Sequence, residues 1–322
     1  MGGILSAIHN YATATAQAWP PNPTFSTEQI PDLTGRVVIV TGGNTGVGKE
    51  TVKALLQHNA KVYLAARSKE RAEAAIADLK TATGKEAIWL ELDLANLASV
   101  RHAAKEFLSK ERELNILFNN AGVMWCPVEL LTADGFDMQF GTNVIGHFLF
   151  TELLIPALEE GAKTSPDGHS RVVTTSSSGA YFETLHYDTF RDSPARKRLG
   201  THGLYFQSKF GNAVVAREIA RRYADKGILS FSCNPGNLKT DLQRYVSSFE
   251  LAILNRILYP ASYGALTQLW AGTMPDVVDH NGDFLIPWAR FGRCREEVYD
   301  PKVGEELWNY LQEQVKEHTA NA

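Results

Sequence analysis

The chain has 322 residues, of which 44% are hydrophobic and 21% charged, and its formal net charge is −4. This length allows one large α/β domain or two small ones, and the negative charge excludes the basic field that a nucleic-acid partner needs. The three cysteines form no CxxC pair, and the nine histidines show no ligand-like spacing with Cys, Asp or Glu. We therefore expect no metal site. Because the sequence shows no secretory h-region, we also expect a cytoplasmic protein.

Residues 1–33 are predicted to form an N-terminal extension, a short helix followed by a proline-rich linker at 19–31 that runs over the surface. The stretch MGGILS fits the MGxxxS myristoylation pattern, although no basic cluster follows to give the second signal that stable anchoring requires. Ile4, Ile8 and Tyr11 form a short apolar stripe, and such a helix more often packs on its own domain than on lipid. We favour that interpretation and leave weak membrane association through the N-terminus open.

From residue 34 to residue 322, apolar runs of strand length alternate with helical stretches, which predicts a single domain. This alternation favours a doubly wound parallel sheet of about seven strands with helices on both faces. The expected strands are 36–40, 61–66, 87–92, 115–118, 171–176, 228–232 and 283–286. The expected helices are 46–58, 68–83, 96–111, 135–161, 203–226, 261–274 and 302–318.

The stretch TGGNTGVGKET, residues 41–51, fits two phosphate-binding patterns. Gly43 to Lys49 matches GxxxxGK of nucleotide hydrolases, and the same stretch matches TGxxxGxG of nicotinamide-dinucleotide enzymes. A hydrolase needs Ser or Thr directly after the lysine to place a hydroxyl on magnesium, whereas Glu50 follows here. The dinucleotide interpretation is favoured, because glycines that follow a strand and open a helix let the backbone approach a pyrophosphate.

The end of the second strand indicates which dinucleotide binds. An acid about 20 residues beyond the glycine turn would bind the ribose hydroxyls of NAD. No Asp or Glu lies between Glu50 and Glu70, and Arg67, Ser68 and Lys69 stand at this place instead. Because a guanidinium suits a 2′-phosphate, we expect NADP(H). The alternative is that Arg67 and Lys69 are solvated surface charges.

The stretch YFQSK places Tyr205 and Lys209 four residues apart, on one face of a helix. An ammonium beside a phenol lowers the pKa of the tyrosine, which suits a group that exchanges a proton with a carbonyl oxygen. Further motifs follow strands: NNAG at 119–122, three consecutive serines after the fifth strand, and NPGNLKT at 234–240, while Asn143 lies inside a long apolar helix. Each motif alone has an ordinary explanation as a turn, a loop or a helix kink. These explanations do not account for the joint occurrence of the motifs in this order.

With these motifs the chain resembles the short-chain dehydrogenase/reductase family over roughly residues 34–290, and the branch of retinol dehydrogenases and WW-domain oxidoreductases looks closest. The resemblance implies a Rossmann-type fold and an NADP(H)-dependent oxidoreductase. Its substrate would be a small molecule of apolar character: a bulky hydrophobic or aromatic ketone or aldehyde, or the corresponding alcohol. A homodimer is compatible with the resemblance.

The resemblance also implies catalytic roles. Tyr205 would be the general acid in reduction and the base in oxidation, and Lys209 would lower its pKa and hold the nicotinamide ribose. Ser177 would hydrogen-bond the substrate oxygen, with Ser178 as the alternative. Asn143 would hold a water that links Lys209 to solvent.

For the cofactor, the resemblance places Asp93 at the adenine, Asn120 on the ribose side and Thr240 at the carboxamide. The expected cofactor-binding residues are Gly42, Asn44, Thr45, Gly46, Val47, Gly48, Arg67, Lys69, Asp93, Leu94, Asn120, Ala121, Gly122, Tyr205, Lys209, Pro235, Gly236, Leu238 and Thr240.

Two features depart from the simplest family members. Asn59 stands where glycine is usual, a change that the tolerance of Asn for left-handed geometry makes harmless. Ser177 lies 28 residues before Tyr205, the longer spacing of the retinol-dehydrogenase branch, and the additional segment 181–204 borders the substrate side.

Several aromatic residues are expected near the substrate. Residues 240–262 would form a lid over the site or, equally well, an amphipathic helix packed on the sheet, because apolar periodicity fits both. A lid would make the pocket apolar and roomy. The aromatic residues are Trp125, Tyr181, Phe182, Tyr245 and Phe249.

One rival function is a non-catalytic NADP-binding sensor or scaffold of the same fold. Such a protein would be expected to have lost Tyr205 or Lys209, and both are present. The other rival, a nucleotide hydrolase, lacks a magnesium ligand at position 50.

Overall fold

The computed structural model describes residues 2–239 and 258–319. In this part of the chain the strands form one sheet in the order β3-β2-β1-β4-β5-β6-β7-β8. Neighbouring strands from β3 to β7 run parallel, and β8 pairs antiparallel with β7. The strands are β1 Val37–Thr41, β2 Lys61–Ala66, β3 Ile88–Glu91, β4 Ile116–Asn119, β5 Ser170–Thr175, β6 Ile228–Cys233, β7 Phe284–Ile286 and β8 Arg290–Gly292.

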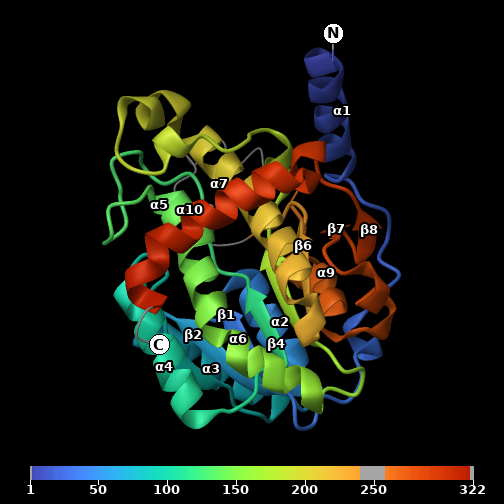
Figure 1. Ribbon diagram of the computed structural model, residues 1–322. Coiled ribbons are helices and arrows are strands. Elements are labelled where there is room, and N and C mark those ends of the chain that lie inside the picture. The colour runs from blue at the N-terminus through green and yellow to red at the C-terminus, as the bar shows by residue number, and fades with distance from the viewer. Residues whose placement is uncertain (1, 240–257, 320–322) are drawn as a thin grey trace.

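Helices cover both faces of the sheet (Figure 1). In β1, Val37 and Ile39 enter one hydrophobic cluster, and Val38 and Val40 enter another. Because successive side chains of a strand point to opposite faces, the sheet has a core on each side. The first cluster includes α4 Leu97–Lys110, α6 Gly146–Thr164, α7 Pro194–Tyr223 and α10 Pro301–Thr319; the second includes α2 Gly46–Gln57, α3 Lys69–Thr83 and α9 Ala261–Thr273.

The predicted doubly wound α/β fold is confirmed, and every expected strand is present. The sequence missed β8, which has only three residues, Arg290–Gly292, and follows β7 after the turn 287–289. Three residues are too few to show the alternation by which a strand is recognised. The left-handed geometry expected at Asn59 is present, with a φ of 72° at the end of α2. The Ser68 side chain caps α3.

The long helix expected at 135–161 is interrupted. α5, Met138–Phe140, continues into a π-helical turn at Gly141–Ile145, which leads into α6. Such turns are rare and frequently occur at functional sites, and Asn143 lies within this one. Among the described residues, Met138–Thr164 is the one helical stretch long and apolar enough to cross a membrane, but 89% of its most apolar window is buried inside the protein. Its apolar character is therefore explained by its position in the core.

The helix expected at 203–226 begins earlier than predicted. α7 starts at Pro194, after the Ser193 cap, and is broken at Gly200, whose φ is 69°. The additional segment before Tyr205 therefore contributes one helical stretch of its own. Gly200 ends that stretch and redirects the chain into the helix that carries Tyr205.

The N-terminal helix α1, Gly2–Ala16, extends away from the body of the protein (Figure 1). Ile8 and Tyr11 of its expected apolar stripe are 61% and 66% exposed, although the Tyr11 ring lies 6.2 Å from the ring of Phe182. The side chain of Ile4 lies outside the described residues. Closer contact with the body is made at the end of this segment, where Ala14 and Gln17 are buried. The segment therefore packs on its own domain, as expected, but mainly through residues other than those of the stripe.

The proline-rich linker is also more than a surface connection. Phe25, Ile30 and Leu33 are buried in the hydrophobic cluster that contains α2 and α9. The polar composition of 19–31 concealed Phe25 and Ile30, which together with Leu33 fix the path of the chain into β1.

Candidate active site

A cavity of about 460 Å³ lies where β1, β2, β4, β5 and β6 end. Ligands bind in open α/β sheets at this edge, outside the carboxyl ends of the strands. The cavity brings together most of the residues predicted from the sequence. These are Gly42, Asn44, Thr45, Gly46, Val47, Gly48, Arg67, Asp93, Leu94, Asn120, Ala121, Gly122, Ser177, Ser178, Tyr205, Lys209, Pro235, Gly236 and Leu238.

Three of the predicted catalytic and cofactor-binding residues do not line the described part of the cavity. Lys69 points away, because its ammonium lies 3.7 Å from a Glu73 carboxylate oxygen and over the ring of Trp89. Asn143 is buried beneath the cavity. Thr240 lies outside the described residues.

The glycine turn between β1 and α2 is closely packed. A Cβ on Gly48 would lie 2.3 Å from the carbonyl oxygen of Gly42 and 2.6 Å from Nδ2 of Asn120. Gly42 has a φ of 67°, a conformation that other residues rarely adopt. The turn therefore needs glycine at both positions. It leaves the N-terminus of α2 facing the cavity, where its amide groups and helix dipole suit a pyrophosphate.

Arginines gather where the adenosine end of a dinucleotide would lie. Arg67, Ser68 and Arg71 line the cavity there. The sequence analysis missed Arg71, which lies in the first turn of α3. Among the described lining residues, Asp93 is the only acid, and its carboxylate accepts the N–H of Ala95 at 3.0 Å. The residues present therefore fit a phosphorylated dinucleotide.

The NNAG turn is held by Thr41, the last residue of β1. The Thr41 hydroxyl oxygen accepts the N–H groups of Asn120 and Ala121, each at 2.9 Å, and Nδ2 of Asn120 donates to the carbonyl of Thr41 at 2.8 Å. His147, which the sequence analysis did not single out, contacts the same hydroxyl at 2.9 Å through Nε2. Burial lowers the pKa of His147 to about 4, so this histidine is neutral at physiological pH.

Asn143 supports the segment after the NNAG turn. Its side chain accepts the N–H of Val123 at 2.9 Å and donates to the carbonyl of Val123 at 3.0 Å and to the hydroxyl of Ser208 at 2.9 Å. Its own carbonyl contacts Nδ1 of His147 at 3.0 Å. The structure thus places the asparagine side chain in the support of the cavity rather than on its wall.

Tyr205, Ser177 and Lys209 meet in the cavity. Ser177 hydrogen-bonds Tyr205, and Lys209 donates to the carbonyl of Thr175 at 2.9 Å, with Nζ 5.8 Å from the centre of the Tyr205 ring. Burial raises the pKa of Tyr205 to about 12 and lowers that of Lys209 to about 8. The lowered tyrosine pKa expected from the YxxxK spacing is therefore absent, because desolvation of the phenolate dominates at this buried position.

The other end of the cavity is apolar. Trp125 and Phe182 line it as predicted, whereas Tyr181 does not. The Tyr181 hydroxyl is turned to the interior, where it donates to the carbonyl of Arg293 and accepts from Gln17. Tyr245 and Phe249 lie outside the described residues, as does most of the predicted lid. Further lining side chains that the sequence analysis missed are Met124, Met138, Phe206 and Leu258.

The loop after β6 completes the wall. Asn234 accepts the N–H of Gly236 at 3.0 Å through Oδ1 and donates through Nδ2 to the side chain of Gln17 at 2.8 Å. Gln17, from the N-terminal extension, therefore contacts both this loop and Tyr181. No group of three or more His, Cys, Asp or Glu residues within 2–239 and 258–319 is arranged to hold a metal ion.

Comparison with known proteins identifies the family. A family model described as short chain dehydrogenase matches residues 36–189. A short-chain dehydrogenase/reductase from Armillaria gallica is 58% identical over 94% of this chain and 97% of its own length. The chain belongs to the short-chain dehydrogenase/reductase family. The resemblance inferred from the motifs is thus confirmed, and the nucleotide-hydrolase alternative is wrong.

Two further comparisons refine this assignment. Retinol dehydrogenase 11 from Mus musculus is 42% identical over 86% of this chain and 85% of its own length, which confirms the retinol-dehydrogenase-like character. A solved short chain dehydrogenase from Shigella flexneri, in complex with NADP, has the same fold, with a TM-score of 0.63 and 22% identity over 80% of this chain and 98% of its own.

Proposed function

We propose that this protein is an NADP(H)-dependent oxidoreductase that interconverts a bulky hydrophobic or aromatic ketone or aldehyde and its alcohol. The observation that carries the proposal is the single cavity of about 460 Å³. It joins the glycine turn and two arginines at one end to Ser177 and Tyr205 in the middle and to apolar side chains at the other end. A dinucleotide and an apolar carbonyl compound would meet at Tyr205 in such a cavity.

Preference for NADP(H) over NAD(H) is proposed from the charges at the adenosine end. Arg67 and Arg71 offer two guanidinium groups to a 2′-phosphate, and no acid stands in β2 or the turn that follows it. The NADP complex of the Shigella flexneri relative agrees with this proposal. Lys69, which was expected to contribute, is not included.

In the proposed mechanism, Tyr205 donates its phenolic proton to the carbonyl oxygen during reduction and removes the hydroxyl proton during oxidation. Ser177 hydrogen-bonds the same oxygen, and its contact with Tyr205 supports that role. A bound nicotinamide supplies or accepts the hydride. Lys209 stabilises the phenolate that forms after proton transfer. Because the pKa of Tyr205 is about 12, the protonated form that reduction needs predominates at neutral pH.

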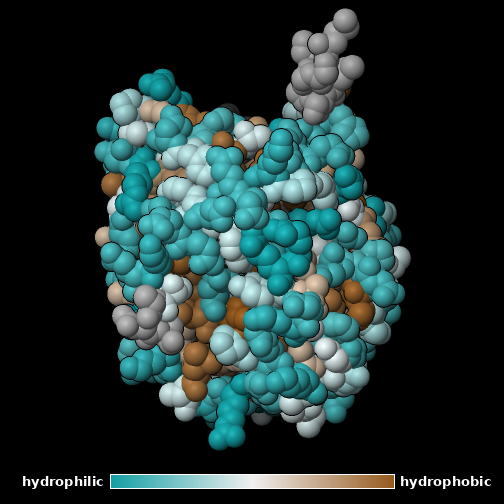
Figure 2. Space-filling view, viewed as in Figure 1, coloured by the Kyte–Doolittle hydropathy of each residue, from teal (hydrophilic) through white to brown (hydrophobic). Residues whose placement is uncertain are grey.

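We also propose that residues 34–322 form the catalytic domain and residues 1–33 an extension to it, with a lid around 240–262, in a cytoplasmic protein. Weak membrane association is supported by the exposed Ile8 and Tyr11 on α1. A homodimer is supported by the hydrophobic atoms visible between α4 and α6 (Figure 2). The helix α4 also carries Leu108, which is 40% exposed. Vesicle flotation and sedimentation of the purified protein test these two points.

The function is tested by following NADPH consumption with a panel of aromatic and long-chain aldehydes and ketones. We expect turnover with NADPH and weaker turnover with NADH. Tyr205→Phe should lower kcat at least 100-fold, because general acid catalysis contributes about 10²- to 10⁴-fold. Tyr223→Phe is the matched control, since that hydroxyl bonds Glu152 outside the cavity. NADPH binding without turnover across the panel would favour the sensor or scaffold instead.

A further inference from the structure

Two segments far apart in the sequence meet at the substrate end of the cavity. Trp125 follows the NNAG turn, and His202 stands three residues before Tyr205 in α7. The two rings have centroids 4.4 Å apart and planes inclined by 51°. Trp125 lines the cavity, whereas His202 does not and is exposed to solvent. The imidazole therefore supports the indole from outside the cavity.

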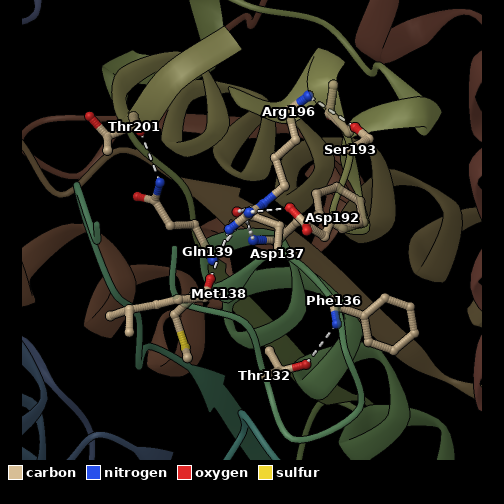
Figure 3. Close-up of polar contacts among 12 residues, drawn as sticks. Thr132, Phe136, Asp137, Met138, Gln139, Asp192, Ser193, Arg196 and Thr201 are labelled. Atoms are coloured by element: carbon tan, nitrogen blue, oxygen red, sulfur yellow. Dashed lines mark hydrogen bonds and ion pairs between the residues drawn. The ribbon is translucent and has the colours of Figure 1, made fainter. Parts of the chain in front are cut away.

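One buried amide joins these segments. Gln139, in α5, is 1% exposed. Its Oε1 accepts the N–H of Trp125 at 2.7 Å, and its Nε2 donates to the carbonyl of Thr201 at 2.8 Å. The second contact is visible in Figure 3, where the Gln139 side chain points towards Thr201. Gln139 thus fixes the backbone at Trp125 and next to His202 with a single side chain.

Gln139 itself is rigidly held. The Asp137 carboxylate caps α5 by accepting the N–H groups of Gln139 and Phe140 at 3.0 and 2.9 Å. Arg196 donates to the same carboxylate at 3.0 Å and to the carbonyl of Leu130 at 2.8 Å (Figure 3). Both partners of this ion pair are almost completely buried. The start of α5, which carries Gln139, is therefore held both by the Asp137 cap and by Arg196 of α7.

Two features make Trp125 an unfavourable residue for stability alone. Its φ is 53°, in the left-handed region that residues with a Cβ avoid. Its indole Nε1 is buried and has no hydrogen-bond partner in the part of the chain that the structure describes. A leucine or methionine at this position would leave no unpaired N–H group. Strain of this kind is typical of functional positions.

We propose that Gln139 is a positioning residue that holds Trp125 as a flat recognition surface, which selects substrates with a planar aromatic or conjugated ring beside the reacting carbonyl. This inference rests on the proposed function. An aromatic face gains attraction from another aromatic ring beyond the area that it buries, whereas a saturated ring of similar size gains only the burial. The Trp125 indole in the cavity wall would thus narrow the substrate preference from apolar compounds in general to compounds with an unsaturated ring.

The test compares 2-naphthaldehyde with its fully saturated counterpart, decahydronaphthalene-2-carbaldehyde. We expect the wild type to prefer the planar aldehyde in kcat/KM, and Trp125→Leu to reduce this preference roughly 3- to 10-fold. Gln139→Leu should reduce the preference in the same direction while leaving the dissociation constant of NADPH unchanged. Asn115→Leu is the matched control, because Asn115 is a buried amide that joins Val37 to Gly161 at the opposite edge of the sheet. It should lower stability without changing the preference.

A binding measurement separates this inference from the proposed function. The two corresponding alcohols are titrated calorimetrically into the NADPH-bound protein, so that no turnover is needed. Tighter binding of the planar alcohol that is weakened in Trp125→Leu and Gln139→Leu supports the inference, even if neither aldehyde is reduced and the proposed function fails. Equal binding of the two alcohols by the wild type, or a preference that survives in folded Trp125→Leu, overturns the inference.

Discussion

Replacement of Lys209 by methionine should stabilise the fold while it removes a proposed catalytic group. Lys209 lies in the middle of α7, where its buried side chain reaches the end of β5, and 3% of the residue is exposed. Burial lowers its pKa from 10.5 to about 8, which means that the folded state disfavours the charged form. Methionine has a similar length, adapts its shape and carries no charge, so it removes this penalty.

The size of the effect follows from the pKa. The fall of the Lys209 pKa from 10.5 to about 8 corresponds to roughly 3 kcal/mol in favour of the neutral form. The lost hydrogen bond to the Thr175 carbonyl offsets about 1 kcal/mol of this gain. That carbonyl is not left unpaired, because Nδ2 of Asn212 also donates to it at 3.1 Å. We therefore expect Lys209→Met to raise the free energy of unfolding by about 2 kcal/mol at pH 7.

The pH dependence has a definite sign. Below pH 8 the lysine is protonated in both states, and the wild type bears the whole penalty. Between pH 8 and pH 10.5 the folded state loses its proton before the unfolded state, so wild-type stability rises. The advantage of Lys209→Met should therefore shrink across this window.

The assay is urea unfolding, followed by tryptophan fluorescence at pH 7, 8.5 and 10 without cofactor. Lys163→Met serves as the control, because Lys163 is an exposed lysine paired with Glu160. Its substitution should not stabilise the protein at pH 7, so no advantage should be lost as the pH rises. If Lys209→Met is less stable than the wild type at pH 7, or if its advantage does not change from pH 7 to pH 10, burial of the Lys209 charge does not destabilise the fold.

Two further predictions concern the cofactor. Arg67→Gln combined with Arg71→Gln should raise the KM for NADPH about 10- to 100-fold and leave the KM for NADH nearly unchanged, because charge-assisted hydrogen bonds contribute about 1.5–3 kcal/mol. The control is Lys69→Gln, because Lys69 does not line the cavity. Equal effects on the KM values of the two cofactors would contradict the proposed role of the two arginine charges. Gly48→Ala should weaken NADPH binding at least 10-fold by calorimetry, because a Cβ there lies 2.3 Å from a backbone carbonyl and overpacking costs about 1–3 kcal/mol. Gly84→Ala introduces strain at a φ of 73° with nothing within 4 Å, so it should lower stability and leave NADPH affinity intact.

The parts of the site that are contiguous in sequence could be predicted. The glycine turn, the NNAG turn and the Tyr205–Lys209 pair each lie within a few residues of one strand end or one helix face, so their geometry is local. The doubly wound parallel sheet, though not the order of its strands, followed from the alternation of strands and helices along the chain. Chemistry at the ends of parallel strands is predictable because the fold brings those ends together.

The parts that depend on long-range pairing could not be predicted. Arg71 was passed over because nothing local distinguishes an arginine that faces a cavity from one on the surface. The prediction that Lys69 binds the cofactor was wrong for a related reason. Residues two positions apart on a helix, such as Lys69 and Arg71, point in directions about 200° apart, so Lys69 points away from the cavity that Arg71 lines. The pKa of Tyr205 is raised, against expectation, because burial, which sequence spacing does not report, outweighs the lowering effect of the hydrogen bond with Ser177.

The walls of the cavity depend on two buried glutamines that no motif contains. Gln139 joins Trp125 to Thr201, and Gln17 joins Tyr181 to Asn234 in the loop after β6. Each spans segments more than 50 residues apart in at least one of its contacts, as the separation of 62 residues for Gln139 and 164 for Gln17 shows. A neutral amide suits this task because it donates and accepts at once and places no charge beside an apolar substrate. The catalytic residues therefore come from local motifs, whereas the shape of the substrate end is determined by the tertiary contacts around them, including one from the N-terminal extension.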